Sequence, residues 1–127
     1  MGAVIAVARR PRSTRMRRVD TQVRQVLAEA IGRELSDPRL GFVTITRVEA
    51  TQDVREAKVW FTTLRTRDRQ ASQDALDSAR GVLQGRLAAE LRARHTPQLT
   101  FHYDTSQRDA EALSRLIDEV AGPGDDE

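Results

Sequence analysis

The spacing of apolar positions predicts a first helix over residues 20–35. Asp20 is a suitable N-cap, and Asp37-Pro38 ends the helix because the residue before a proline disfavours the helical conformation. The face opposite the apolar stripe is polar, so this helix is expected to lie on a core. The stripe consists of residues three and four positions apart: Val19, Val23, Val26, Leu27, Ala30, Ile31 and Leu35.

Two strands are predicted after this helix. β-Branched and aromatic residues from Phe42 to Glu49 predict the first strand, and residues 56–64 predict its hairpin partner across a turn at Thr51-Gln52-Asp53. The alternation of apolar and polar residues slips near Arg47, which is typical of a β-bulge.

A second helical region begins near Ser72, and Pro97 closes it. Two glycines, Gly81 and Gly85, interrupt it, and each costs about 1 kcal/mol relative to alanine. One interpretation is a small residue at a helix–helix contact. The other is a bend at Ala79-Arg80-Gly81, which would expose backbone N–H groups that suit phosphate. The apolar stripe of the region is Leu76, Ala79, Leu83, Leu87 and Leu91.

A third strand and a last helix complete the order. Residues 98–104 alternate, with Leu99, Phe101 and Tyr103 on one face. A capping-box pattern at Ser106-Gln107-Arg108-Asp109 predicts a helix whose apolar face is Leu113, Leu116, Ile117 and Val120. The order α-β-β-α(α)-β-α, with the second helical region either one helix or two, indicates an α+β domain with helices packed on one face of a three-stranded sheet. The predicted core is Val23, Leu27, Ile31, Val43, Ile45, Val59, Phe61, Leu83, Leu87, Phe101 and Ile117.

Length and charge divide the chain into three parts. Its 127 residues fit one domain, and the absence of cysteine excludes disulfides, thiolate zinc sites and a cysteine nucleophile. The net charge of +2 is unevenly spread: residues 1–18 hold six arginines and no acid, and residues 122–127 hold three acids and no base. We therefore expect a flexible basic arm over 1–18, a domain over 19–121 and a disordered acidic tail over 122–127. Every basic residue except Lys58 is an arginine, and guanidinium groups contact phosphate bidentately and stack on bases.

The sequence gives little support to a membrane, metal or catalytic role. The first apolar run precedes its arginines, the reverse of a secretory signal, and no run is long enough to span a bilayer, so we expect a cytoplasmic protein. No P-loop, H-E-x-x-H or G-x-S-x-G motif occurs, and the acids are scattered. His95 lies at a helix end. His102 and Asp104, on one strand face, leave an RNA hydrolase as the enzymatic alternative.

Several short sequence motifs, taken in their order along the chain, resemble those of the ribosome-binding factor A family. They run over residues 12–120, and the most specific is Asp37-Pro38-Arg39-Leu40-Gly41 between a helix and a strand. The others are Arg17-Arg18-Val19, Val48-Glu49, Asp53 followed by Ala57-Lys58-Val59, Ala79-Arg80-Gly81, Pro97-Gln98-Leu99-Thr100-Phe101, and Tyr103-Asp104.

The resemblance implies a KH-like fold of the second topological type, in which an A-x-G kink at Ala79-Arg80-Gly81 replaces the usual G-x-x-G loop. It also implies a non-enzymatic factor that binds the free small ribosomal subunit and its 16S rRNA late in assembly and aids 16S rRNA processing. Such a factor is linked to cold adaptation and needs no cofactor, metal, membrane or small-molecule substrate. We expect it to be a monomer.

The candidate RNA-binding residues are arginines on the side of the first helix, and others on the kinked helix that surround or follow the start of its second half. Arg24, Arg33 and Arg86 each lie four residues from an acid or a small polar group and could be purely structural. The alternatives to an assembly factor are a ribosomal protein, an adaptor that acts through protein contacts, and the RNA-processing enzyme above. The candidates are Arg17, Arg18, Arg24, Arg39, Arg80, Gly81, Arg86, Arg92 and Arg94.

Overall fold

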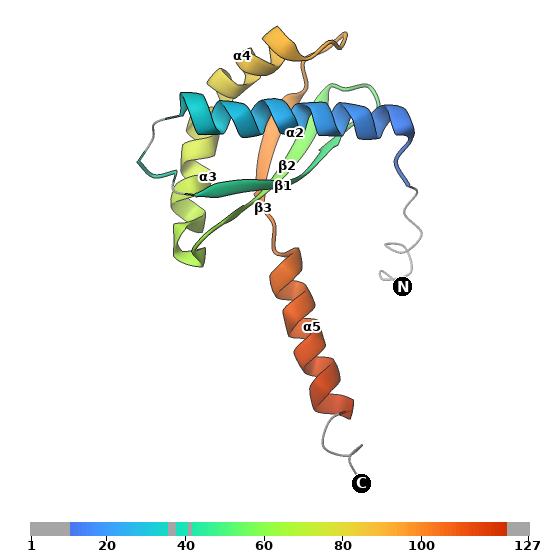
Figure 1. The fold of residues 1–127 in the computed structure, drawn as a ribbon, viewed down its shortest axis with the longest axis vertical. Coiled ribbons are helices and arrows are strands. Elements are labelled where there is room, and N and C mark those ends of the chain that lie inside the picture. The colour runs from blue at the N-terminus through green and yellow to red at the C-terminus, as the bar shows by residue number, and fades with distance from the viewer. Residues whose placement is uncertain (1–10, 36–37, 41, 122–127) are drawn as a thin grey trace.

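A computed structural model describes residues 11–35, 38–40 and 42–121 (Figure 1). The predicted flexible arm and acidic tail fall largely on residues 1–10 and 122–127, which lie outside the described residues. The α+β order that the sequence predicts is confirmed. The elements are α2 (Thr14–Glu34), β1 (Val43–Ala50), β2 (Glu56–Thr63), the 3-10 helix η1 (Thr66–Asp68), α3 (Arg69–Ser78), α4 (Arg80–Glu90), β3 (Gln98–Tyr103) and α5 (Ser106–Ala121).

The three strands form one mixed sheet in the order β1-β2-β3. β1 and β2 are the predicted antiparallel hairpin, and β3 lies parallel to β2 after the crossover through α3 and α4. The pairing shifts between Ile45 and Arg47, which confirms the predicted bulge and leaves Thr46 as the extra residue. Because of this shift, Arg47 lies opposite Trp60, and Val48 lies opposite Val59.

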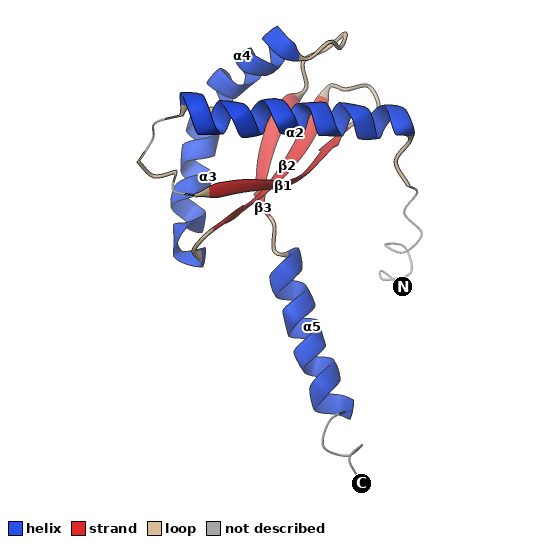
Figure 2. Cartoon of the chain, viewed as in Figure 1, coloured by secondary structure: helices blue, strands red, loops and turns tan. Residues whose placement is uncertain are grey.

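Helices α2, α3 and α4 lie along one side of the sheet and bury its apolar side chains (Figure 2). Most of the predicted core is confirmed, because helical and strand periodicity placed these residues on the covered faces. Val43 and Ile45 are partly buried and pack against the core. The buried members of the prediction are Val23, Leu27, Ile31, Val59, Phe61, Leu83, Leu87 and Phe101.

The first helix begins six residues earlier than predicted, and its N-cap is Ser13 rather than Asp20. The Ser13 hydroxyl accepts a hydrogen bond from the backbone N–H of Met16 at 3.2 Å. Met16 is only 5% exposed, so the apolar stripe extends one turn N-terminal to Val19. The arginines of this segment had indicated a solvated arm instead.

The predicted kink is confirmed. Helix α3 ends at Ser78 and α4 begins at Arg80, with Ala79 between them at φ −86° and ψ 1°. The two helices run in clearly different directions (Figure 1). None of the helices in the described part of the chain is both long and apolar enough to cross a membrane.

The prediction that α5 packs on the core is wrong. This helix leads away from the sheet (Figure 1), and Ile117, assigned to the core, is 57% exposed. Its neighbours Leu113 and Leu116 are 58% and 56% exposed. The apolar spacing correctly predicted a helix with one apolar face, but spacing within one helix does not determine which surface, if any, covers that face.

Candidate nucleic-acid interface

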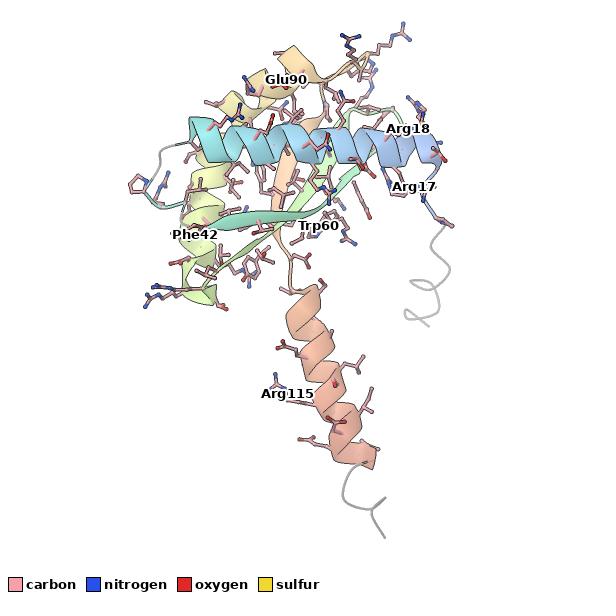
Figure 3. The ribbon with its side chains drawn as sticks, in the orientation of Figure 1. Arg17, Arg18, Phe42, Trp60, Glu90 and Arg115 are labelled. Carbon is pink, nitrogen blue, oxygen red and sulfur yellow. The ribbon has the colours of Figure 1, made fainter. Side chains whose placement is uncertain are left out.

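The structure distributes six of the eight predicted arginines over three surfaces, and two of these surfaces flank the beginning of α2. The first, here called the α2–β1 groove, is a hollow lined by Arg17, Arg24 and Arg47, with Asp20, Thr21, Thr46 and Val48. Arg17 and Arg24 lie seven positions apart, about two helical turns, so both project from one side of α2. Arg18 is exposed on the same helix but does not line this groove (Figure 3).

The one acid in the α2–β1 groove is already paired. Both oxygens of Asp20 accept hydrogen bonds from Arg12, with Nη2 to Oδ1 at 2.9 Å, and Oδ1 also accepts the backbone N–H of Ala50 at 2.9 Å. Arg12 Nη2 donates in turn to the carbonyl of Ala50 at 2.7 Å. Asp20 therefore joins α2 to the end of β1, and because Arg12 balances its charge, the other arginines leave the groove positive.

The second surface, here called the loop cluster, brings Arg92 and Arg94 beside Arg15. These residues, with Asp53, Val54, Arg55 and His95, line a hollow where the start of α2 meets the β1–β2 turn and the loop after α4. The hydroxyl of Thr51 and the backbone N–H of Arg55 lower the pKa of Asp53, so this carboxyl stays ionised at neutral pH. Its Oδ2 lies 3.6 Å from Arg55 Nε.

Arg92 and Arg94 therefore do not surround the kink. They follow the C-terminal end of α4, and the 11 residues of that helix place its two ends about 16 Å apart. Arg86, within α4, forms an ion pair with Glu90, with Nη2 2.7 Å from Oε2, which is the i,i+4 pairing that the structural alternative anticipated.

The third surface is the kink itself, where Arg39 and Arg80 meet the start of α4. Arg39 Nη2 donates to Ser78 Oγ at 3.3 Å, and Arg80 Nη2 donates to Asp77 Oδ1 at 2.9 Å. Ala79 gives α4 no side-chain cap. The first N–H groups of a helix have no partner within it and carry its positive dipole end, so this surface suits an anion.

Gly81 is exposed in the first turn of α4, and a methyl group added at this position would meet nothing within 4 Å. The fold itself therefore does not require glycine here. A glycine that packing does not need, next to an uncapped helix end, leaves the backbone open to close approach by a ligand.

Arg47 and Trp60 are not among the site residues that the sequence predicts. The Arg47 guanidinium carbon lies 3.9 Å from the centroid of the Trp60 ring. Because the bulge shifts the register of β1, simple alternation along the strand does not predict the face on which Arg47 lies. The alternation of Ala57, Val59 and Phe61 toward the core already placed Trp60 on the opposite face, and that signal could have found it.

His102 and Asp104 do not form the pair that a general base would need. His102 Nε2 is 3.0 Å from Thr100 Oγ1, whereas Asp104 accepts hydrogen bonds from Thr46 Oγ1 at 2.5 Å and from the N–H of Ser106 at 2.9 Å. The bonds from Ser106 and Thr46 lower the pKa of Asp104. Within the described residues, no group of three or more His, Asp or Glu side chains could hold a metal ion.

Comparison with known proteins gives a consistent result. The family model described as ribosome-binding factor A matches residues 15–117. The chain is 50% identical over 99 residues to ribosome-binding factor A of Burkholderia multivorans, which covers 78% of this chain and 74% of that protein. It is 43% identical over 116 residues to the Halorhodospira halophila protein of the same name, which covers 89% and 92%.

A crystal structure and a fitted homology model from Thermus thermophilus are among the structures similar to this chain. The crystal structure of ribosome-binding factor A from Thermus thermophilus superposes with a TM-score of 0.63 at 30% identity, over 69% of this chain and 94% of that one. A homology model of the Thermus thermophilus factor, fitted into a cryo-EM map of its complex with the 30S subunit, gives a TM-score of 0.58 at 30% identity, over 68% and 91%.

Proposed function

Because this chain belongs to the ribosome-binding factor A family, we propose that it binds the free small ribosomal subunit and its 16S rRNA late in assembly. It does so in the cytoplasm as a monomer, without a cofactor, a membrane or a small-molecule substrate. It acts without chemistry of its own and aids 16S rRNA processing, including at low temperature, by favouring one local rRNA conformation. A binding protein shifts such an equilibrium only through its different affinity for the two conformations.

The observation that carries this proposal is the interrupted helix. The uncapped first turn of α4 presents backbone N–H groups, and Arg39 and Arg80 lie beside it on Ser78 and Asp77. Gly81 leaves no side chain over this surface. KH modules hold the backbone of single-stranded RNA at a comparable position between two helices. We assign phosphate contact to the kink and additional charge contact to Arg17, Arg24, Arg92 and Arg94.

The balance of charge is more typical of a factor that dissociates from the subunit than of a permanent ribosomal protein. Residues 19–121 carry 15 basic and 16 acidic side chains, so attraction to RNA is confined to local surfaces. Phosphate contacts weaken as salt rises, so a modest number of them permits release.

The test is sedimentation of lysates from a strain depleted of the chain and complemented with defined variants. The wild-type chain is expected to migrate with free small subunits and not with translating ribosomes, and its depletion is expected to leave precursor 16S rRNA, more so in the cold. Migration with translating ribosomes would instead support a ribosomal protein. Normal 16S processing after depletion would contradict the processing role.

One substitution separates this proposal from the enzymatic alternative. His102→Phe keeps an aromatic ring on the strand and removes the imidazole nitrogens, the groups of this side chain that can accept a proton. We expect this variant to restore 16S processing fully. If it binds small subunits but leaves the precursor unprocessed, the non-enzymatic account is wrong.

A further inference from the structure

The face of the sheet away from the helices carries a row of three planar side chains. Arg47 lies opposite Trp60, and Trp60 lies opposite His102, so one side chain comes from each strand. The next row, Val48, Val59 and Phe101, is buried against the helices. Because side chains alternate along a strand, the planar row points to the opposite face, which none of the helices in the described part of the chain covers. We call Arg47, Trp60 and His102 the planar row.

The members of the planar row contact one another. The Arg47 guanidinium carbon lies 3.9 Å from the centroid of the Trp60 ring, and the Trp60 and His102 ring centroids are 5.7 Å apart at 37°. The Arg47 side chain is 50% exposed, and His102 is exposed as well. The core on the other side of the sheet does not use this tryptophan, so its indole has no packing role there.

The planar row is continuous with the α2–β1 groove. Arg47 belongs to both, because it lines the groove with Arg17 and Arg24 and also lies over Trp60. A groove of arginines next to partly exposed π systems is the combination that binds single-stranded nucleic acid, since arginines hold phosphates while bases stack on rings and guanidinium planes. Glu49 lies 3.9 Å from Arg47 and partly balances its positive charge. Stacking on Arg47 and Trp60 would therefore contribute to RNA affinity in addition to the attraction between charges.

We propose that the planar row is a second RNA-binding site, separate from the kink, which stacks an unpaired base of a strand whose phosphates lie in the α2–β1 groove. This inference rests on the proposed function and adds the class of RNA structure recognised, an unpaired nucleotide. The base stacks on the pair of the exposed Arg47 and the half-buried Trp60, and His102 extends the surface on β3.

Trp60 supplies its own reporter, because it is the chain's one tryptophan. The first experiment titrates the full chain with a single-stranded adenosine 10-mer RNA, and in parallel with inorganic polyphosphate, an anion without bases. The RNA is expected to quench the tryptophan emission and polyphosphate is expected to leave it nearly unchanged. RNA binding with no change in emission, or the same change with both anions, would overturn the proposal.

The second experiment measures the affinity of variants for the same labelled RNA by fluorescence anisotropy. Trp60→Leu is expected to weaken binding roughly five-fold or more, and Trp60→Phe, which keeps a ring, less than about two-fold. Leu64→Ser is the matched control, because Leu64 is 73% exposed and lies outside both surfaces. Circular dichroism checks that each variant folds. Equal affinity of Trp60→Leu and the wild type would overturn the proposal.

Small-subunit sedimentation distinguishes this inference from the function on which it rests. If the wild type binds subunits while Trp60→Leu binds RNA normally, the planar row is not a base site but the proposed function stands. If Trp60→Leu loses subunit binding but keeps RNA affinity, the row contacts a ribosomal protein and the RNA proposal is wrong. If the wild type binds no subunits at all, the proposed function fails, whatever the RNA titration shows.

Discussion

Replacing Gly81 with alanine separates a structural role of the kink from a role in binding. Gly81 is the second residue of α4, and Gly85 lies in the middle of the same helix. A methyl group at either position would meet nothing within 4 Å, so neither substitution should introduce a clash. Gly85→Ala is therefore a matched control, with the same chemical change four residues further along.

The structure predicts opposite effects of Gly81→Ala on stability and on binding. Alanine is favoured over glycine inside a helix by up to about 1 kcal/mol, so Gly85→Ala should stabilise the fold by roughly that amount. Gly81→Ala, in the first turn, should stabilise it by less. For a domain of this size such gains raise Tm by roughly 2–4 °C. If an RNA backbone approaches the start of α4, the added methyl at position 81 should weaken small-subunit binding by about ten-fold.

The assay pairs thermal unfolding by circular dichroism with pelleting of each variant through a sucrose cushion with free small subunits. Wild-type binding by Gly81→Ala would refute the assignment of ligand approach to the kink. Equal loss by Gly81→Ala and Gly85→Ala would refute it too, because the effect would then come from helix stability. A large fall in the Tm of Gly81→Ala would refute the claim that the fold has room there.

Two further predictions concern the contacts that position these surfaces. Asp20→Ala removes the bonds to Arg12 and leaves the N–H of Ala50 without its acceptor, so the free energy of unfolding should fall by about 3 kcal/mol and Tm by about 10 °C in a melting experiment; a change below about 1 kcal/mol would contradict this reading. Asp104→Asn should lower the free energy of unfolding by about 1 kcal/mol at pH 7. Because the folded-state pKa of Asp104 is lowered from 3.8, its contribution is present above pH 3.8 and is lost as pH falls through the lowered value. Melts at pH 7 and at successively lower pH should therefore show a difference that shrinks once the pH falls below 3.8, and a difference that stays equal throughout would contradict this assignment.

The elements that could be predicted from sequence are those specified by local patterns. Alternation placed the three strands, the slip near Arg47 marked the bulge, and the glycine-bearing stripe marked the break at Ala79. Each of these signals lies within a few neighbouring residues, which is the range over which backbone preference and side-chain periodicity act.

The remaining features depend on contacts between distant segments. The true start of α2 is fixed by the Ser13 cap and by Arg12, which reaches Ala50 across 38 positions. Arg92 and Arg94 lie beside Arg15 only because the loop after α4 returns to the start of α2. These contacts join residues far apart in the sequence, and no local pattern encodes them. The sequence pattern therefore predicted that Arg92 and Arg94 belong to the kink.

The central claim, that arginine surfaces of this chain hold rRNA on the small subunit, is tested most directly by measuring subunit affinity against salt. Each phosphate contact on a single strand contributes about −0.7 to the slope of log affinity against log salt. Replacing the groove arginines Arg17, Arg24 and Arg47 with glutamine should therefore make the slope shallower by about 2. The same charge change at the exposed residues Arg65, Arg67 and Arg115 should leave the slope close to that of the wild type. Affinity that does not vary with salt, or an equal change of slope in both triple variants, would contradict the account.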